Sequence, residues 1–158
     1  MSMLPFRKIL CPTDFSDPAL VALQRAEELA RHFAAELLVL HVIPEVPGPH
    51  AYSDPPVATS FDVALYEQEL TVYAENLLKE LVSHQVSPEV RTRDLVTSGL
   101  AAPEILRVAT QEHVDLIVIA SHGETGWRRL VFGSVAEKVV RHAPCPVLTI
   151  TSPPEEGE

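Results

Sequence analysis

The chain has 158 residues, of which 46% are hydrophobic, a composition that predicts one globular domain with a sizeable buried core. Acidic residues outnumber basic ones by 22 to 12, and the resulting net charge of −10 argues against nucleic acid as a partner, because such binding depends largely on basic groups that contact phosphates. No apolar run reaches the roughly 18 residues that a membrane-spanning helix needs, and the start of the chain lacks a secretory signal pattern, so we expect no membrane partner and a cytoplasmic location.

The first part of the chain predicts a strand, a helix and a second strand. Phe6 to Cys11 is a short apolar segment typical of a buried strand. Asp17 is a favourable N-cap residue, and Pro18 suits the first position of the helix that follows. Apolar residues then recur every three or four positions as far as Phe33, which indicates a helix with one buried face. Leu37 to Ile43 is the second buried strand.

Asp14 lies in the turn between the first strand and the first helix, within the segment Pro12-Thr13-Asp14-Phe15-Ser16. In a parallel α/β sheet this is the carboxyl edge, where ligands bind and where a carboxylate can accept hydrogen bonds from ribose hydroxyls. Aspartate also commonly accepts hydrogen bonds from N–H groups of its own turn. Both interpretations stay open at this point, and the ribose interpretation is preferred.

The middle of the chain predicts a long loop, a long helix, an edge strand and a third helix. Residues 44–60 contain five prolines, and we interpret them as a mobile flap over the ligand crevice, with a slack loop as the alternative. Phe61 to His84 is a helix. Its expected core face consists of Ala64, Leu65, Leu70, Val72, Ala74, Leu77, Leu78 and Leu81. Pro88 to Val96 alternates charged and apolar residues, which favours an edge strand, and Glu104 to Glu112 follows as a helix.

The last part of the chain contains a strand buried on both faces, Leu116 to Ala120, followed by Ser121-His122-Gly123. Gly133-Ser134 then opens an amphipathic helix. The free N–H groups at a helix start, together with the helix dipole, favour an anion, so this segment predicts a phosphate site. The alternative is that Ser134 and Glu137 form a capping box and Ser134 merely caps the helix.

Five strands alternate with four helices once Val147 to Thr151 is counted as the final strand. This alternation predicts a doubly wound α/β domain with a parallel sheet and right-handed crossovers, which we assign to residues 1–152. Residues 153–158 form an acidic tail that we expect to be disordered.

Cysteine and histidine spacing predicts neither a disulfide nor a metal site. Cys11 ends the first strand and Cys145 precedes the last, so a parallel sheet would hold the two thiols at opposite ends, too far apart to bond. Two lone cysteines do not make a zinc site, and the seven histidines show no metal-ligand spacing.

The segment from Ala120 to Ser134 resembles the nucleotide loop of the universal stress protein (UspA-like) family. Neither Gly-x-x-x-x-Gly-Lys-Ser/Thr nor Gly-x-Gly-x-x-Gly occurs in the chain. The family's ATP-binding members carry Gly, two residues, Gly, nine residues, Gly and Ser/Thr, which this chain matches from Gly123 to Ser134, with Ala120 in place of the first glycine. The resemblance extends from Lys8 to Leu148.

The resemblance implies a Rossmann-like stress-response protein with strand order 3-2-1-4-5 that binds ATP, with or without Mg. It implies that Asp14 contacts the ribose, that the Val42 backbone contacts adenine, and that N–H groups of the glycine loop surround the phosphates. The residues implied to form the site are Pro12, Thr13, Asp14, Val42, Ala120, His122, Gly123, Gly133, Ser134 and Val135. It also implies a homodimer, paired antiparallel through Val147, Leu148, Thr149 and Ile150 of the last strand.

We interpret the chain as a binding or regulatory module rather than an enzyme, because it has no P-loop lysine and no evident pair of catalytic carboxylates. Arg128 and Arg129 leave a slow ATPase or phosphoryl-transfer enzyme as one alternative. A second alternative is a member that does not bind ATP because the Ala120 methyl crowds the ligand. A signalling receiver domain is disfavoured, since that class resembles a pattern with a lysine near the end of the last strand, which has none here.

Overall fold

The computed structural model describes residues 4–45, 63–122 and 132–151, and in these ranges strands and helices alternate along the chain. The elements are β1 (Lys8–Pro12), α1 (Asp17–Phe33), β2 (Glu36–Ile43), α2 (Val63–Gln85), β3 (Thr92–Ser98), α3 (Ala101–Gln111), β4 (Leu116–Ala120), α4 (Ser134–His142) and β5 (Val147–Ile150). The five strands form one parallel sheet in the order β3-β2-β1-β4-β5. The predicted doubly wound fold and strand order are therefore confirmed.

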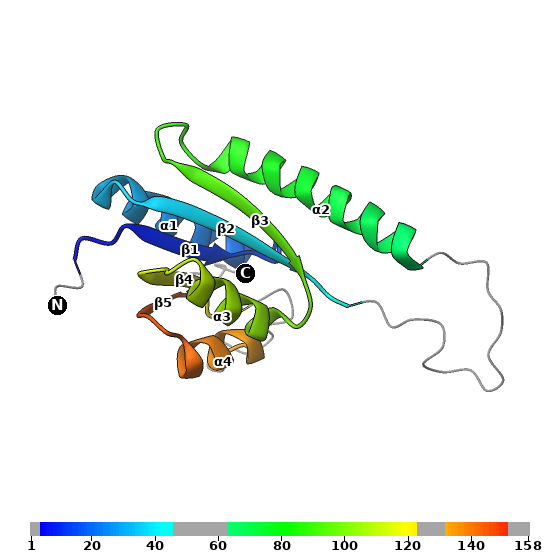
Figure 1. The fold of residues 1–158 in the computed structure, drawn as a ribbon. Helices are drawn as coiled ribbons and strands as arrows, with labels where there is room; N and C mark the ends of the chain where they lie inside the picture. The colour runs from blue at the N-terminus through cyan, green and yellow to red at the C-terminus, as the bar shows by residue number, and fades with distance from the viewer. Residues whose placement is uncertain (1–3, 46–62, 123–131, 152–158) are drawn as a thin grey trace, which may run out of the picture.

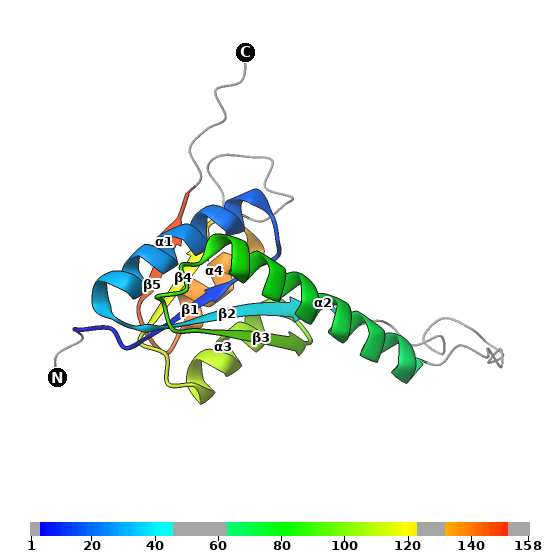
Figure 2. The same cartoon turned by 90° about the horizontal axis from the view of Figure 1, so that it is seen from above.

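Helices cover both faces of the sheet (Figure 1 and Figure 2), and on each face an apolar core packs between the sheet and its helices. Side chains alternate between the two faces along each strand, so neighbouring residues enter different cores. In β4, Val118 packs with residues of α1 and α2, whereas Ile117 and Ile119 pack with residues of α3 and α4. This is why the central strands are apolar at every position and not at alternate ones.

Several predicted boundaries shift by a few residues. β3 starts at Thr92 and not at Pro88, because Val90 N–H donates to Ser87 O and closes a turn before the strand. α3 starts at Ala101, three residues before the predicted Glu104. Pro103 is accommodated because the first turn of a helix has N–H groups without intrahelical partners, so the missing proline donor costs nothing there.

The predicted core face of α2 is wrong in its first half. Ala74 and Leu78 are buried, but Ala64 is exposed, and Leu65 and Val72 are 53% and 50% exposed. α2 has 23 residues and is about 35 Å long, whereas β3 has 7 residues and spans about 23 Å. The helix therefore projects past the edge of the sheet, as Figure 1 shows, and its first turns have no sheet beneath them. Residues 46–62, which hold most of the predicted flap, lie outside the described ranges.

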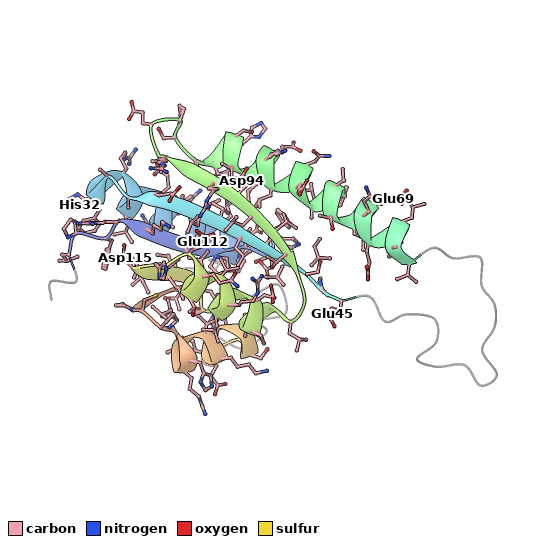
Figure 3. The ribbon with its side chains drawn as sticks, viewed as in Figure 1. His32, Glu45, Glu69, Asp94, Glu112 and Asp115 are labelled. Carbon is pink, nitrogen blue, oxygen red and sulfur yellow. The ribbon has the colours of Figure 1, made fainter. Side chains whose placement is uncertain are left out.

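An ion-pair network closes the amino edge of the sheet, where Figure 3 marks Glu112 and Asp115. The Asp115 carboxylate accepts hydrogen bonds from the backbone N–H groups of Arg7 (2.8 Å) and Lys8 (2.9 Å), just as β1 begins. Glu112 pairs with Lys8 and with Arg93. The amino ends of β1, β3 and β4 are thus tied together by charge.

Cys11 is buried near the end of β1 and Cys145 lies just before β5, and both are free thiols. In the described ranges no helix is long and apolar enough to cross a membrane. A search of the same residues finds no group of three or more histidine, cysteine or acidic side chains that could hold a metal ion.

Candidate functional site

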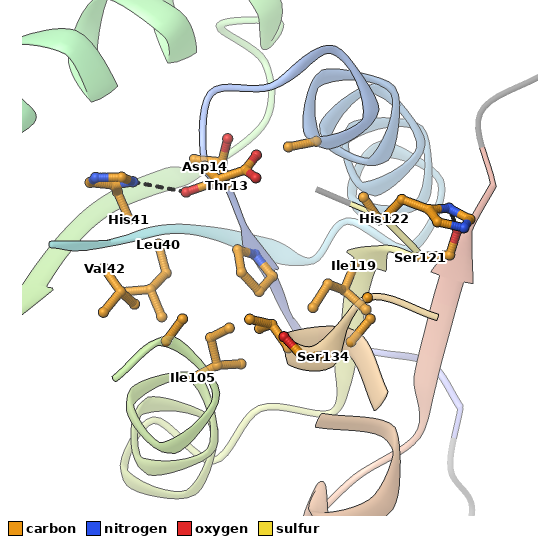
Figure 4. A pocket seen from close by; sticks show the side chains of 17 residues that line it. Thr13, Asp14, Leu40, His41, Val42, Ile105, Ile119, Ser121, His122 and Ser134 are labelled. Carbon is orange, nitrogen blue, oxygen red and sulfur yellow. Dashed lines mark hydrogen bonds between the residues drawn. The ribbon is translucent and has the colours of Figure 1, made fainter. Parts of the chain in front are cut away.

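A cavity of about 360 Å³ opens at the carboxyl edge of the sheet, where the chain leaves β1 toward one face and β4 toward the other (Figure 4). Its volume lies within the roughly 300–1,000 Å³ of typical small-molecule sites, and such switch points are the usual ligand sites of open α/β sheets. The cavity is lined by Pro12, Thr13, Asp14, Ala19, Leu40, His41, Val42, Ala101, Ile105, Ile119, Ala120, Ser121, His122, Gly133, Ser134, Val135 and Ala136.

Every predicted site residue within the described ranges lines this one cavity. These residues are Pro12, Thr13, Asp14, Val42, Ala120, His122, Gly133, Ser134 and Val135. They come from β1, β2, β4 and the start of α4, so the sheet topology brings together residues more than a hundred positions apart in the sequence. Gly123, Arg128 and Arg129 lie outside the described residues.

Asp14 lies exposed at the cavity rim, and its carboxylate is held by the turn that contains it. Its Oδ1 accepts a hydrogen bond from Ser16 N–H at 3.1 Å and another from the Ser16 hydroxyl. The turn role considered for Asp14 is thus observed. No hydrogen bond within the described residues uses the second carboxylate oxygen, which leaves it available to a ligand.

Ser16, and not the predicted Asp17, is the N-cap of α1. The Ser16 backbone is extended, with φ −72° and ψ 160°, and its hydroxyl accepts a hydrogen bond from Ala19 N–H at 3.4 Å. Asp17 is instead the first helical residue, where its charge complements the helix dipole. Ser16 therefore links the start of the helix to the carboxylate of Asp14.

The start of α4 presents backbone donors to the cavity. Gly133 is the N-cap, with φ −58° and ψ 149°, and Ser134 is the first helical residue, so the capping box considered for Ser134 is not formed. The N–H groups of Ser134, Val135 and Ala136 fall in the first turn, where a helix has no acceptor for them, and all three residues line the cavity. The dipole of α4 adds partial positive charge there.

One detail of the expected phosphate contacts is corrected. Gly133 N–H donates to Ser121 O at 2.8 Å, so this donor is already used. The bond holds the start of α4 against the end of β4, and Ser121 N–H in turn donates to Ile150 O at 2.8 Å. Gly133 thus serves the site by allowing close approach of a ligand and not by donating to it.

The backbone of Val42 points into the space beyond β1. Leu40 O accepts a hydrogen bond from Thr13 N–H at 2.8 Å, on the β1 side of β2. Backbone groups two residues apart in a strand point the same way, so the N–H and C=O of Val42 also face that side. β1 has ended at Pro12, and therefore these groups face the cavity and not a neighbouring strand.

The inner wall of the cavity is apolar, whereas its rim carries the polar groups. Leu40, Ile105 and Ile119 line the wall and belong to the α3 and α4 core. Figure 4 shows Asp14 and Ser134 on different sides of the opening. Among the described lining residues Asp14 is the one carboxylate, and there is no lysine or arginine. The wall suits a flat apolar ring, and the helix N-terminus suits an anion.

The two histidines of the site lie on opposite sides of it (Figure 4). His41 Nδ1 lies 2.9 Å from Thr13 O, and this hydrogen bond joins the end of β2 to the turn after β1. The His122 ring lies beside β5, with Nδ1 2.7 Å from the Ser121 hydroxyl, and its Nε2 is buried without a hydrogen-bond partner in the described residues. His122 is therefore turned away from Asp14.

Sequence patterns missed several lining residues. Leu40 was assigned to a buried strand, Ile105 to a helix and Ala101 to no element, so none of the three was predicted to line the site. The signal that identifies them is topological, because the end of β2 and the first turns of α3 reach the same carboxyl edge as β1 and β4. Which strand ends are neighbours along that edge is known only when the strand order is known.

Comparison with known proteins identifies the family. Residues 5–151 match the model of the Universal stress protein family. The chain is 32% identical over 151 residues to universal stress protein MJ0531 of Methanocaldococcus jannaschii, which covers 96% of this chain and 85% of that protein. It is 30% identical over 153 residues to universal stress protein MJ0577 of the same organism. This alignment covers 92% of this chain and 94% of that protein.

Solved structures agree with the sequence comparison. The structure of MJ0577 gives a TM-score of 0.76 at 28% identity, covering 95% of this chain and 99% of that one. Universal stress protein UspA from Lactobacillus plantarum gives 0.71 at 27% identity, covering 92% and 97%. A universal stress protein in complex with cAMP shares the fold alone, at 19% identity and a TM-score of 0.58. The alignment covers 92% of this chain and 96% of that one. The chain belongs to the universal stress protein family.

Proposed function

We propose that this protein binds ATP in the cavity between β1 and β4 and acts as a nucleotide-binding regulatory module of the stress response. The observation that carries the proposal is the juxtaposition of the Asp14 carboxylate with the first turn of α4 on one cavity. A carboxylate suits ribose hydroxyls, and a helix N-terminus suits phosphates. A nucleotide carries ribose hydroxyls and phosphates in one molecule, together with a flat base that suits the apolar wall.

In the proposed complex each part of ATP meets a chemically matched part of the cavity. Adenine lies on the apolar wall, with its polar edge on the backbone of Val42. The ribose lies against Thr13 and Asp14. The phosphates lie at Ser134 and Val135, with Gly123 completing the loop, while the remaining predicted site residues, Pro12, Ala120, His122 and Gly133, form the walls.

Mg²⁺ would accompany ATP, because the described lining residues supply no cationic side chain to balance the phosphates. The helix N-terminus contributes only partial charge, roughly half an elementary charge. With one carboxylate and no lysine or arginine in that lining, the site is suited to holding ATP more than to hydrolysing it. The proposed role is therefore binding and not efficient catalysis.

Ala120 favours binding over the alternative of a member that cannot accept ATP. Its side chain belongs to the apolar core beneath α1, and the residue is only 9% exposed. The methyl group that distinguishes it from the family glycine is thus packed largely in the core. Ala120 thus lines the cavity with only a small exposed surface.

We further propose a homodimer that pairs β5 with β5 of a second copy. β5 is an edge of the sheet, and nothing in its sequence Val147-Leu148-Thr149-Ile150 discourages pairing, since it has no charge and no proline. Leu148 of β5 is 40% exposed, so pairing at this edge would cover apolar surface. The proposed domain comprises residues 1–152, and the acidic tail 153–158 lies outside it. We also propose a cytoplasmic location, because the two free thiols fit a reducing compartment.

Calorimetric titration with ATP, with and without Mg²⁺, tests the binding proposal directly. Gly133→Val should abolish binding, because the valine backbone tolerates the extended φ and ψ of residue 133 while its side chain fills the phosphate space. Lys138→Val, at an exposed position of the same helix, is the matched control and should bind like the parent. Equal ATP affinity in Gly133→Val and the parent would show that the phosphates do not lie there.

A further inference from the structure

The turn that carries Asp14 holds an unfavourable backbone conformation. Phe15, directly after Asp14, has φ +64°, in the left-handed region that bulky residues rarely adopt. Such a conformation persists only where the surrounding structure imposes it, and it is common at functional sites. Asp14 is therefore oriented by whatever stabilises this turn.

Local hydrogen bonds account for part of that stabilisation. Phe15 N–H donates to the Thr13 hydroxyl at 3.1 Å, and Ser16 N–H donates to Asp14 Oδ1 at 3.1 Å. Both bonds join residues two positions apart. They shape the turn but do not fix its position relative to the sheet.

The end of β2 supplies the link to the sheet. Leu40 O accepts from Thr13 N–H at 2.8 Å, and His41 Nδ1 lies 2.9 Å from Thr13 O. Because a carbonyl oxygen can only accept, the hydrogen of this second bond is on His41 Nδ1. The two backbone groups of Thr13 are thus held by two consecutive residues of the neighbouring strand.

His41 also contacts the strained residue itself. Its ring packs on the ring of Phe15 with centroids 4.5 Å apart and planes inclined by 44°. One side chain therefore bonds to the residue before Asp14 and packs on the residue after it (Figure 4 shows the bond). Asp14 lies between these two anchors.

We propose that His41 is a positioning residue for nucleotide recognition, which holds the Thr13–Ser16 turn so that the free carboxylate oxygen of Asp14 meets the ribose hydroxyls. This inference rests on the proposed function, which supplies ATP as the ligand. His41 also lines the cavity, and the role proposed for it acts through its contacts with Thr13 and Phe15. Its effect should therefore appear in ribose recognition and spare the phosphates.

Two substitutions separate the hydrogen bond from the packing. His41→Asn keeps an N–H donor at the position of Nδ1 and should preserve the bond to Thr13 O. His41→Phe keeps an aromatic ring against Phe15 but has no donor. Titration of each variant with ATP and with 2′,3′-dideoxy-ATP, which lacks both ribose hydroxyls, isolates the ribose contribution.

The parent should prefer ATP over the dideoxy analogue by about tenfold or more, the size expected for hydrogen bonds to a charged carboxylate. His41→Phe should lose most of that preference, as Asp14→Ala should, and His41→Asn should retain it. If His41→Phe weakens both nucleotides equally, or retains the preference, His41 does not position Asp14.

A measurement without nucleotide keeps this inference separate from the ATP proposal. Amide hydrogen exchange at Ser16, whose N–H bonds to Asp14, should become faster in His41→Phe and stay at the parent rate in His41→Asn. Unchanged exchange in His41→Phe would overturn the inference. A parent that binds neither nucleotide overturns the ATP function, while the exchange rates still decide whether His41 holds the turn.

Discussion

The carboxylate of Asp14 accepts two hydrogen bonds from Ser16, one from its backbone N–H and one from its hydroxyl, and the same hydroxyl accepts from Ala19 N–H in the first turn of α1. Asp14 is thus joined through Ser16 to the helix behind it. A carboxylate held in this way loses little rotational freedom when a ligand binds, which is the physical advantage of preorganisation.

Asp14→Ala should weaken ATP binding by about 1–3 kcal/mol, because it removes charged hydrogen bonds to the ribose. Calorimetric titration measures the change. Asp17→Ala is the control, since Asp17 is also an exposed aspartate at the start of α1 but does not line the cavity. Parent-like affinity in Asp14→Ala would remove Asp14 from the site and leave it only its role in the turn.

Ala120→Gly should change ATP affinity little, because the Ala120 methyl packs in the core beneath α1. Stability should instead fall by roughly 1 kcal/mol or more, since glycine loses more backbone entropy on folding and a buried methyl is removed. Urea denaturation measures the stability, and titration the affinity. A gain in affinity of a hundredfold or more would mean that Ala120 blocks the cavity in the parent.

Thr149→Pro should dissociate the proposed dimer while keeping the fold. Pro146 O and Ile150 O both accept hydrogen bonds from the β4 side, so even-numbered residues of β5 face β4 and Thr149 N–H faces the free edge. Proline at 149 therefore removes an outer donor and spares the inner ladder. Sedimentation at micromolar concentration should show a dimer for the parent and a monomer for the variant.

Two further variants serve as controls for Thr149→Pro. Thr149→Val keeps the N–H and should remain dimeric. Leu148→Pro removes an inner donor toward β4 and should destabilise the fold itself, which circular dichroism would detect. A parent that sediments as a monomer would contradict the dimer.

Glu112 should support stability at neutral pH and lose that contribution in acid. The hydrogen bond from Arg93 lowers the pKa of the Glu112 carboxyl in the folded protein, and the charges of Arg93 and Lys8 act in the same direction against partial desolvation. A lowered folded pKa means that the stabilisation is present above the unfolded pKa, near 4.5, and is lost as the pH falls through the folded pKa.

Glu112→Gln should therefore reduce the free energy of unfolding at pH 7 by a few tenths to about 1 kcal/mol, the range for partly exposed pairs. The difference between variant and parent should shrink at pH values below about 4. Urea denaturation at both pH values checks this. Glu89→Gln, at an exposed position in the same region of the chain, is the control, and a constant difference at all pH values would contradict the prediction.

The sequence alone determined the architecture. Continuous apolar runs such as Leu116 to Ala120 require burial on both faces of a sheet, and the helical stripe that ends near Phe33 requires a single buried face. These patterns predict a parallel α/β sheet because few other arrangements bury both kinds of element. The resemblance to the universal stress protein family added the strand order and implied that Asp14 and the start of α4 belong to one site.

Only the tertiary structure decided which hydrogen-bond donor pairs with which acceptor. Asp17 and Ser16 are both favourable caps, and the geometry of the turn selected Ser16. Gly133 N–H is bonded to Ser121, and His41 to Thr13, because neighbouring strand ends bring those acceptors within reach. Periodicity reports how deeply a residue is buried, but hydrogen bonds depend on distance and angle between segments far apart in the chain. For the same reason the apolar first half of α2 is exposed, since its burial required a sheet longer than β3 provides.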